Sequence, residues 1–280
     1  MAEHTDLKRG LREARQNLKN GKVREALARL FHLTEKYPED REVKGEIAYA
    51  LLAQGRDHVE RGKTEQARED FKRSIRYSET PEGHLYLGQM FQESGDYDDA
   101  FAEYTRALDL DEGMPAVHEN LGVYFLEIQD FEQAAKAFSN AIVIGAAGRE
   151  PFIGLWRANV ALERLDRAHE AILDGTKKFP KDDVLMTVAG VSCALRKETA
   201  AAADWWTKAA EANPKNVEPI FHLGGLAARR GDRDEALRAI RRCMTVDAQR
   251  ARALWRADAN SPDSRYMGYH EDEDFIDVFG

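Results

Sequence analysis

The sequence predicts an all-α protein, an α-solenoid of about seven helix hairpins, and three periodic features support this prediction. One alanine recurs along most of the chain, at Ala26, Ala67, Ala100, Ala134, Ala168, Ala202 and Ala236. The first interval is 41 residues, the second is 33, and every later interval is 34. A mostly small residue lies 12 positions before each alanine, and a large apolar residue lies four positions after it. A fixed period of this length is typical of repeat proteins whose neighbouring units share one core.

Each period reads as two helices joined by a tight turn. The small residues let the two helix backbones approach closely, and the large residues fill the space toward the next hairpin. The turn position lies five residues before each alanine, at Gly21, Gly62, Gly95, Gln129, Glu163, Lys197 and Gly231. Glycine at such a position supplies the left-handed conformation that ends a helix. The seven extra residues of the first interval correspond to about two helical turns, so we expect an elongated first helix in the second repeat, near residues 41–61.

The motif is clearest in two copies, HLYLGQMFQESGDYDDAFAEYTRALDLD from His84 and HENLGVYFLEIQDFEQAAKAFSNAI from His118, and it resembles the tetratricopeptide-repeat family. The resemblance covers repeats at about 7–40, 41–80, 81–114, 115–148, 149–182, 183–216 and 217–250. It implies a right-handed superhelix with a concave face formed by the first helices of the hairpins. It also implies a non-catalytic adaptor or scaffold that binds partner segments on that face. We expect residues 1–250 to form the solenoid, and residues 251–280 to form a cap helix, a linker and an acidic, hydrophobic tail.

Composition and motifs argue against several other classes of protein. The net charge of -9 disfavours nucleic acid as the default partner. The N-terminus lacks the apolar region of a secretory signal, and the longest uncharged apolar stretch, 141–147, is too short to span a bilayer. These features predict a cytoplasmic protein with no membrane insertion. Cys193 and Cys243 lie far apart without a CxxC pair, so we expect two buried apolar side chains and no metal site.

Catalytic and cofactor motifs are also missing from the sequence. It contains no P-loop, no dinucleotide-binding loop and no GxSxG nucleophile motif. We therefore expect no enzyme activity and no cofactor. The best-known ligand site of the resembling family is a dicarboxylate clamp for chaperone C-termini. Lys8 and Arg12 match one element of the clamp but lie in the first repeat, and Asn120 matches another without the required neighbours. A co-chaperone-like role is thus one alternative, but it lacks this support.

Four basic residues of the first predicted helix share one helical face: Lys8, Arg12, Arg15 and Lys19. Residues 1–30 contain eight basic and four acidic residues. Two interpretations stay open: a surface that binds an acidic segment of a partner, or the charged, solvated face of a terminal repeat.

The inward positions of the fifth to seventh repeats are largely apolar. The candidate partner-binding residues among them are Ile153, Val184, Val188, Val191 and Phe221. They fit a groove for an amphipathic helix or an extended peptide. The alternative is that tight coiling buries them against neighbouring repeats.

The tail carries seven acidic residues and one basic residue between positions 258 and 280. Its apolar cluster is the candidate tail ligand, made of Phe275, Ile276, Val278 and Phe279. We expect this segment to dock on a groove of its own chain or of a second chain, which would give self-association. The alternative is a terminal helix packed on the last repeat.

Two further alternatives concern the function of the whole protein: a regulatory subunit of an enzyme complex and a self-assembling structural protein.

Overall fold

The computed structural model describes residues 2–279, with side chains from Asp6 onward, and over this range it contains only helices and their connections. The helices are α1 (Ala2–Lys19), α2 (Val23–Lys36), α3 (Arg41–Glu60), α4 (Thr64–Tyr77), α5 (Pro81–Ser94), α6 (Tyr97–Leu110), α7 (Pro115–Glu127), α8 (Phe131–Ile144), α9 (Glu150–Ala161), α10 (Leu165–Lys178), α11 (Asp183–Leu195), α12 (Thr199–Ala212), α13 (Val217–Arg229), α14 (Arg233–Val246), α15 (Ala248–Ala259) and α16 (Glu273–Phe279). The predicted all-α fold is confirmed.

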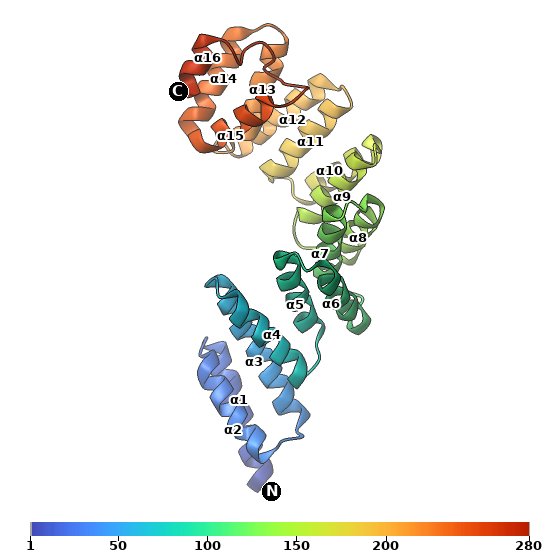
Figure 1. Cartoon of the computed structure of the whole chain (residues 1–280), viewed down its shortest axis with the longest axis vertical. Coiled ribbons are helices and arrows are strands. Elements are labelled where there is room, and N and C mark those ends of the chain that lie inside the picture. The colour runs from blue at the N-terminus through green and yellow to red at the C-terminus, as the bar shows by residue number, and fades with distance from the viewer. Residues whose placement is uncertain (1, 280) are drawn as a thin grey trace. The chain divides into compact units, whose positions relative to one another are not determined.

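The chain forms two compact units. The first runs to Asp130 and includes Asn140–Ala146, and the second contains Phe131–Ser139 and the residues from Ala147 onward. Within each unit, consecutive helices pack side by side as hairpins, for example α3 with α4 in the first unit and α11 with α12 in the second (Figure 1).

The period seen in the sequence is the period of the core. All seven recurring alanines are fully buried. The small residue of the first helix faces the large residue of the second, because a Cβ added to Gly55 or Gly88 would lie 2.5 Å from the Phe71 ring or 2.7 Å from the Tyr104 ring. Helix α3 has 20 residues, so the elongated helix expected in the second repeat is present.

All seven predicted turn positions adopt the left-handed conformation. Glycine occupies four of them, whereas Gln129, Glu163 and Lys197 reach φ values of 61°, 57° and 64°. A residue with a Cβ is strained in this region of backbone space. The packing of the flanking helices therefore imposes the turn even where the sequence does not favour it.

This strain predicts that Glu163→Gly stabilises the protein. Glu163 is exposed and its φ is 57°, so glycine should relieve about 1 kcal/mol of backbone strain without removing a core contact. The control is Lys63→Gly, one residue after a turn position, where φ is −95°. That change should not stabilise the protein, because glycine there only adds freedom to the unfolded chain. Urea unfolding followed by circular dichroism measures both effects, and a loss of stability in Glu163→Gly would contradict the strain argument.

The end of the second unit has one continuous core. Helix α15 packs against α13 and α14, and α16 packs against α14. Trp255 of α15, Tyr266 of the connecting segment and Phe275 of α16 join the same buried cluster as Phe221 and Ile240. Residues beyond the last full repeat thus complete the hydrophobic core of the seventh hairpin.

Candidate functional site

The basic stripe of α1, defined by Lys8, Arg12, Arg15 and Lys19, is exposed along its length. Together with Leu11, Gln16 and Glu42 it lines a pocket of about 380 Å³. A neighbouring pocket between α1 and α3 contains Tyr49, whose side chain is 63% exposed. The stripe therefore has both charge and an adjacent aromatic surface.

The four cations of the stripe are not equivalent. Arg15 donates through Nε to Glu46 Oε1 at 2.6 Å and through Nη2 to Glu42 Oε1 at 2.7 Å. These two hydrogen bonds hold the pKa of Arg15 above its ordinary value. Lys8, Arg12 and Lys19 form no ion pair with any side chain that the structure describes. As far as the described side chains go, three of the four charges are therefore left for a ligand.

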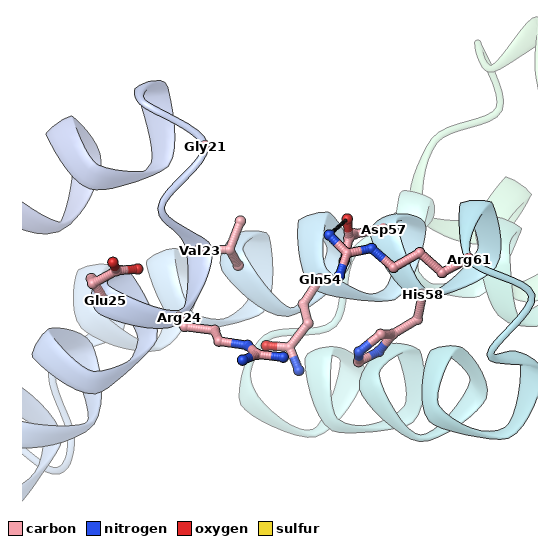
Figure 2. Close-up of a pocket in the computed structure, with 8 residues that line it drawn as sticks. All are labelled: Gly21, Val23, Arg24, Glu25, Gln54, Asp57, His58 and Arg61. Carbon is pink, nitrogen blue, oxygen red and sulfur yellow. Dashed lines mark ion pairs between the residues drawn. The ribbon is translucent and has the colours of Figure 1, made fainter.

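A third pocket of the first unit lies between the start of α2 and the end of α3 (Figure 2). Its Arg61 pairs with Asp57 at 2.8 Å, and its His58 donates a hydrogen bond through Nδ1 to Asp70 Oδ2 at 2.8 Å. Burial raises the pKa of Asp70, and the hydrogen bond from His58 opposes that shift. These pairs balance most of the local charge, so the pocket offers less to a charged ligand than the stripe does.

The apolar strip of the second unit follows the first helices α9 and α11. Ile153 of α9 and Val184, Val188 and Val191 of α11 are all half-buried. Leu195 ends the strip and is 42% exposed. These side chains are accessible for part of their surface, as a groove requires.

A pocket of about 390 Å³ lies at the end of this strip. Its lining combines the apolar side chains of Val191, Leu195 and Trp206 with the basic side chains of Arg229 and Arg265. Lys197, Ser261, Asp263 and Ala194 complete the lining. The sequence did not indicate this pocket, because three of its residues come from the segment after the repeats.

Phe221 does not belong to an open groove, and this part of the predicted strip requires correction. Its side chain is 1% exposed, and its ring lies 5.0 Å from that of Tyr266. The Tyr266 hydroxyl donates to the Phe221 carbonyl at 2.9 Å. Repeat position alone could not reveal this contact, because the covering residue lies 45 positions later in the chain.

The tail contacts its own last hairpin. Phe275 is fully buried and stacks on Trp255 with ring centroids 5.8 Å apart, while Val278 and Phe279 pack partly buried against the same core. Ile276 is 48% exposed.

The tail acids also contact this hairpin. Asp272 accepts a hydrogen bond from Arg233 of α14 at 2.7 Å, and Asp274 contacts the same guanidinium. Of the two arrangements that the sequence left open for the tail, the structure therefore has the terminal helix packed on the last repeat.

One group of potential metal ligands occurs among the described residues. Donor atoms of His169, Cys193 and Glu198 lie within 4.8 Å of one another. Arg196 already pairs with Glu198 at 2.9 Å, and burial raises the pKa of the Cys193 thiol. The group is therefore an ion pair beside a neutral thiol, and both Cys193 and Cys243 are buried as expected.

No helix in the described part of the chain combines the length and the apolar character needed to cross a membrane.

Several solved structures are similar to this chain. PilF of Pseudomonas aeruginosa matches with a TM-score of 0.64 at 20% sequence identity, over 81% of this chain and 98% of that chain. The C-terminal part of a TPR repeat-containing protein from Cytophaga hutchinsonii matches with a TM-score of 0.65 at 17% identity, over 85% and 95%. YrrB, described as a TPR protein with an unusual peptide-binding site, matches with a TM-score of 0.52 at 18% identity, over 67% and 97%. At these identities the similarity shows the fold alone.

The sequence itself matches the family described as Tetratricopeptide repeat over residues 11–57, 52–115 and 91–149. The buried periodic alanines and the left-handed turns extend the same pattern to the remaining hairpins. The fold of this family supports a role in protein interaction generally. Sequence and structure together show that the chain belongs to the tetratricopeptide-repeat family.

Proposed function

We propose that this protein is a non-catalytic adaptor that binds a segment of a partner protein along α9 and α11 of the second unit. The observation that carries the proposal is the half-buried strip of Ile153, Val184, Val188 and Val191, which leads to an exposed Leu195 and a pocket. An apolar strip of this kind gains free energy when a partner covers it. The peptide-binding site named for YrrB supports segment binding as a use of this fold.

The pocket indicates the chemistry of the segment. Its apolar lining suits an apolar side chain, and Lys197 and Arg229 outnumber the single acid, Asp263, whereas Arg265 pairs with Asp258 at 3.3 Å. We therefore expect the bound segment to carry an apolar residue with an acidic residue near it.

The test uses peptides selected from a random peptide library on the immobilised full chain, with affinities measured by fluorescence anisotropy. Leu195→Glu should weaken their binding about tenfold or more, because it places a charge on the apolar lining. The matched control is Leu110→Glu on α6, since Leu110 and Leu195 are 40% and 42% exposed. Equal affinities for Leu195→Glu and the wild type would refute the proposed site.

The basic stripe of α1 is a second candidate surface, for an acidic segment. Exposed charge pairs contribute only about 0.2–1 kcal/mol each, so binding of a hexaglutamate peptide should be weak and should decrease with added salt. Arg12→Glu combined with Lys19→Glu should abolish it without changing stability, because neither side chain pairs with a described carboxylate. Arg15→Glu should instead destabilise the α1–α3 contact, since it would face Glu42 and Glu46. Unchanged peptide binding in the double variant would show that the stripe only solvates the terminal repeat.

The remaining alternatives are a co-chaperone-like protein, a regulatory subunit of an enzyme complex and a self-assembling structural protein. Peptide selection separates the first from the adaptor role, because a co-chaperone-like protein would select peptides with a C-terminal carboxylate. A self-assembling protein would change its sedimentation with concentration.

A further inference from the structure

The segment that follows α15 lies across the face of α13 that corresponds to the strip on α11. Arg229 donates through Nη2 to the main-chain oxygen of Asp263 at 2.9 Å. Three residues on, the Tyr266 hydroxyl donates to the Phe221 carbonyl at 2.9 Å. The segment thus contacts α13 from Phe221, in the first half of the helix, to Arg229 at its C-terminal end, and it covers this side of the helix.

The sequence of α13 is adapted to this contact. Gly225 occupies the position held by Val191 on α11, which lies 34 residues earlier. A Cβ added to Gly225 would lie 2.6 Å from the Cβ of Arg265, closer than two side chains can pack. Valine in the equivalent place leaves α11 open to a partner, whereas glycine on α13 admits the chain's own segment.

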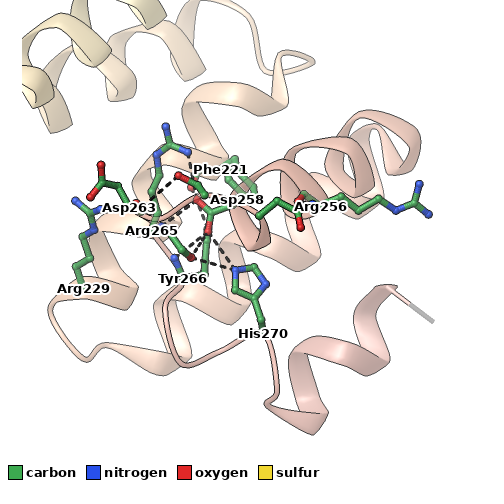
Figure 3. A network of polar contacts seen from close by, with 11 residues as sticks. Phe221, Arg229, Arg256, Asp258, Asp263, Arg265, Tyr266 and His270 are labelled. Atoms are coloured by element: carbon green, nitrogen blue, oxygen red, sulfur yellow. Dashed lines mark hydrogen bonds and ion pairs between the residues drawn. The ribbon is translucent and has the colours of Figure 1, made fainter.

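A buried carboxylate at the end of α15 holds the segment in place (Figure 3). Asp258 is 2% exposed and accepts hydrogen bonds from the Ser264 hydroxyl at 2.7 Å and from the amides of Arg265 and Tyr266 at 2.9 and 3.1 Å. His270 Nε2 lies 3.2 Å from the same carboxylate. These contacts fix residues 264–270 as one unit.

We infer that residues 261–270 occupy the face of α13 that includes Gly225 and Arg229, and that a partner segment bound along α11 extends onto α13 only by replacing them. This inference rests on the proposed function. Residues 261–270 also indicate which side chains a partner segment needs in order to replace them. A segment that replaces it needs an aromatic side chain for the site of Tyr266, and a tyrosine would restore the hydrogen bond to the Phe221 carbonyl.

The geometry allows this exchange without loss of α16. Helix α16 also has contacts outside the segment, through Phe275 on Trp255 and through the pair of Arg233 with Asp272, and it would lose only the ring contacts of Phe275 with Tyr269 and Tyr266, at 5.0 and 6.3 Å. Residues 261–270 can therefore leave α13 as a tethered loop while α16 stays on α14. Because the partner supplies its own aromatic residue, the core around Phe221 is refilled in the bound state.

The decisive variant is Gly225→Ala in the full chain. Alanine favours the helix more than glycine does, but its Cβ overlaps Arg265, so the segment should be expelled while α13 stays folded. Hydrogen exchange of the amides of residues 261–270 should accelerate. The control is Gly45→Ala within α3, where an added Cβ meets no atom within 4 Å and exchange in the segment should not change.

Binding gives the second readout. Peptides selected on the wild type should bind Gly225→Ala about tenfold more tightly if the segment covers α13 for about nine-tenths of the time. Asp258→Asn loosens residues 261–270 without changing α13 itself, and it should also increase the affinity for these peptides. Faster exchange in both variants with no gain in affinity would overturn the inference and leave the segment as a permanent cap.

The two proposals fail in different ways. If no selected peptide is sensitive to Leu195→Glu, the proposed function is wrong, whatever the segment does. If peptides bind at Leu195 but exchange in residues 261–270 stays slow in Gly225→Ala, then the segment does not yield and the inference is wrong while the proposed function stands.

Discussion

Trp206→Ala should lower the free energy of unfolding of the second unit by about 3–5 kcal/mol, the usual cost of removing a buried large aromatic side chain. Trp206 is 2% exposed and fills the space left by Gly190, where an added Cβ would overlap the indole. Its Nε1 also donates to the Thr187 carbonyl at 3.1 Å, so truncation leaves an acceptor without its partner. Packing and hydrogen bonding are thus lost together.

The neighbouring tryptophan provides the matched control. Trp205 is only half-buried: it packs against the edge of the same cluster, and its ring lies 5.1 Å from the Lys208 ammonium. Trp205→Ala should therefore cost less than half as much as Trp206→Ala. Urea unfolding followed by far-ultraviolet circular dichroism avoids the loss of fluorescence in either variant. Equal destabilisation by the two changes would contradict the assigned register of α12.

The same experiment has a pH-dependent component. His222 stacks on Trp206 with ring centroids 4.6 Å apart, and burial lowers the pKa of His222 from 6.5 to about 3. The folded protein therefore binds this proton less readily than the unfolded chain, so stability should fall as the pH drops below 6.5. In Trp206→Ala the cavity exposes the imidazole of His222, so the loss of stability that His222 causes at low pH should be smaller.

The sequence predicts the repeated features because each is determined locally. Ala202 marks the close approach of two helices, and Trp206 follows it by four residues on the same side of α12. Even the left-handed turn at Lys197 was predictable from its place in the period, although its own side chain disfavours that conformation. A pattern that recurs every 34 residues reports the contacts that every hairpin repeats.

The contacts that occur only once could not be found in this way. Tyr266 covers Phe221 from outside the repeats, so the assignment of Phe221 to the open groove was wrong. Arg15 belongs to the predicted stripe by helical spacing, yet its charge is taken up by two carboxylates of the elongated α3. In both cases the contacting residue is brought close by long-range packing. Such a contact does not repeat along the chain, so a single sequence gives no periodic signal for it.

Asp258→Asn should destabilise the segment after α15 by about 3 kcal/mol, because it removes the charge from a buried acceptor of several hydrogen bonds. Asp258 bonds the Ser264 hydroxyl and the amides of Arg265 and Tyr266, and an asparagine NH₂ group would face some of these donors. Hydrogen exchange of residues 264–270 measures the loss, and Asp263→Asn, an exposed acid of the same segment, is the control.

The pH dependence of the stability difference between the wild type and Asp258→Asn shows whether the charge or the shape of the Asp258 carboxylate matters. Burial raises the pKa of Asp258, but the hydrogen bonds from Ser264 and from the amides of Arg265 and Tyr266 outweigh it and bring the pKa below the ordinary 3.8. A lowered carboxyl pKa means stability that is present above pH 3.8 and is lost as the pH falls through the folded value. The stability of the segment in the wild type should therefore exceed that in Asp258→Asn by the full amount at neutral pH and approach it in acid.

A stability difference that stayed constant from neutral pH into acid would mean that asparagine fails because of its shape and not because of its missing charge. Equal exchange rates in wild type and Asp258→Asn at neutral pH would show that the carboxylate does not hold the segment at all.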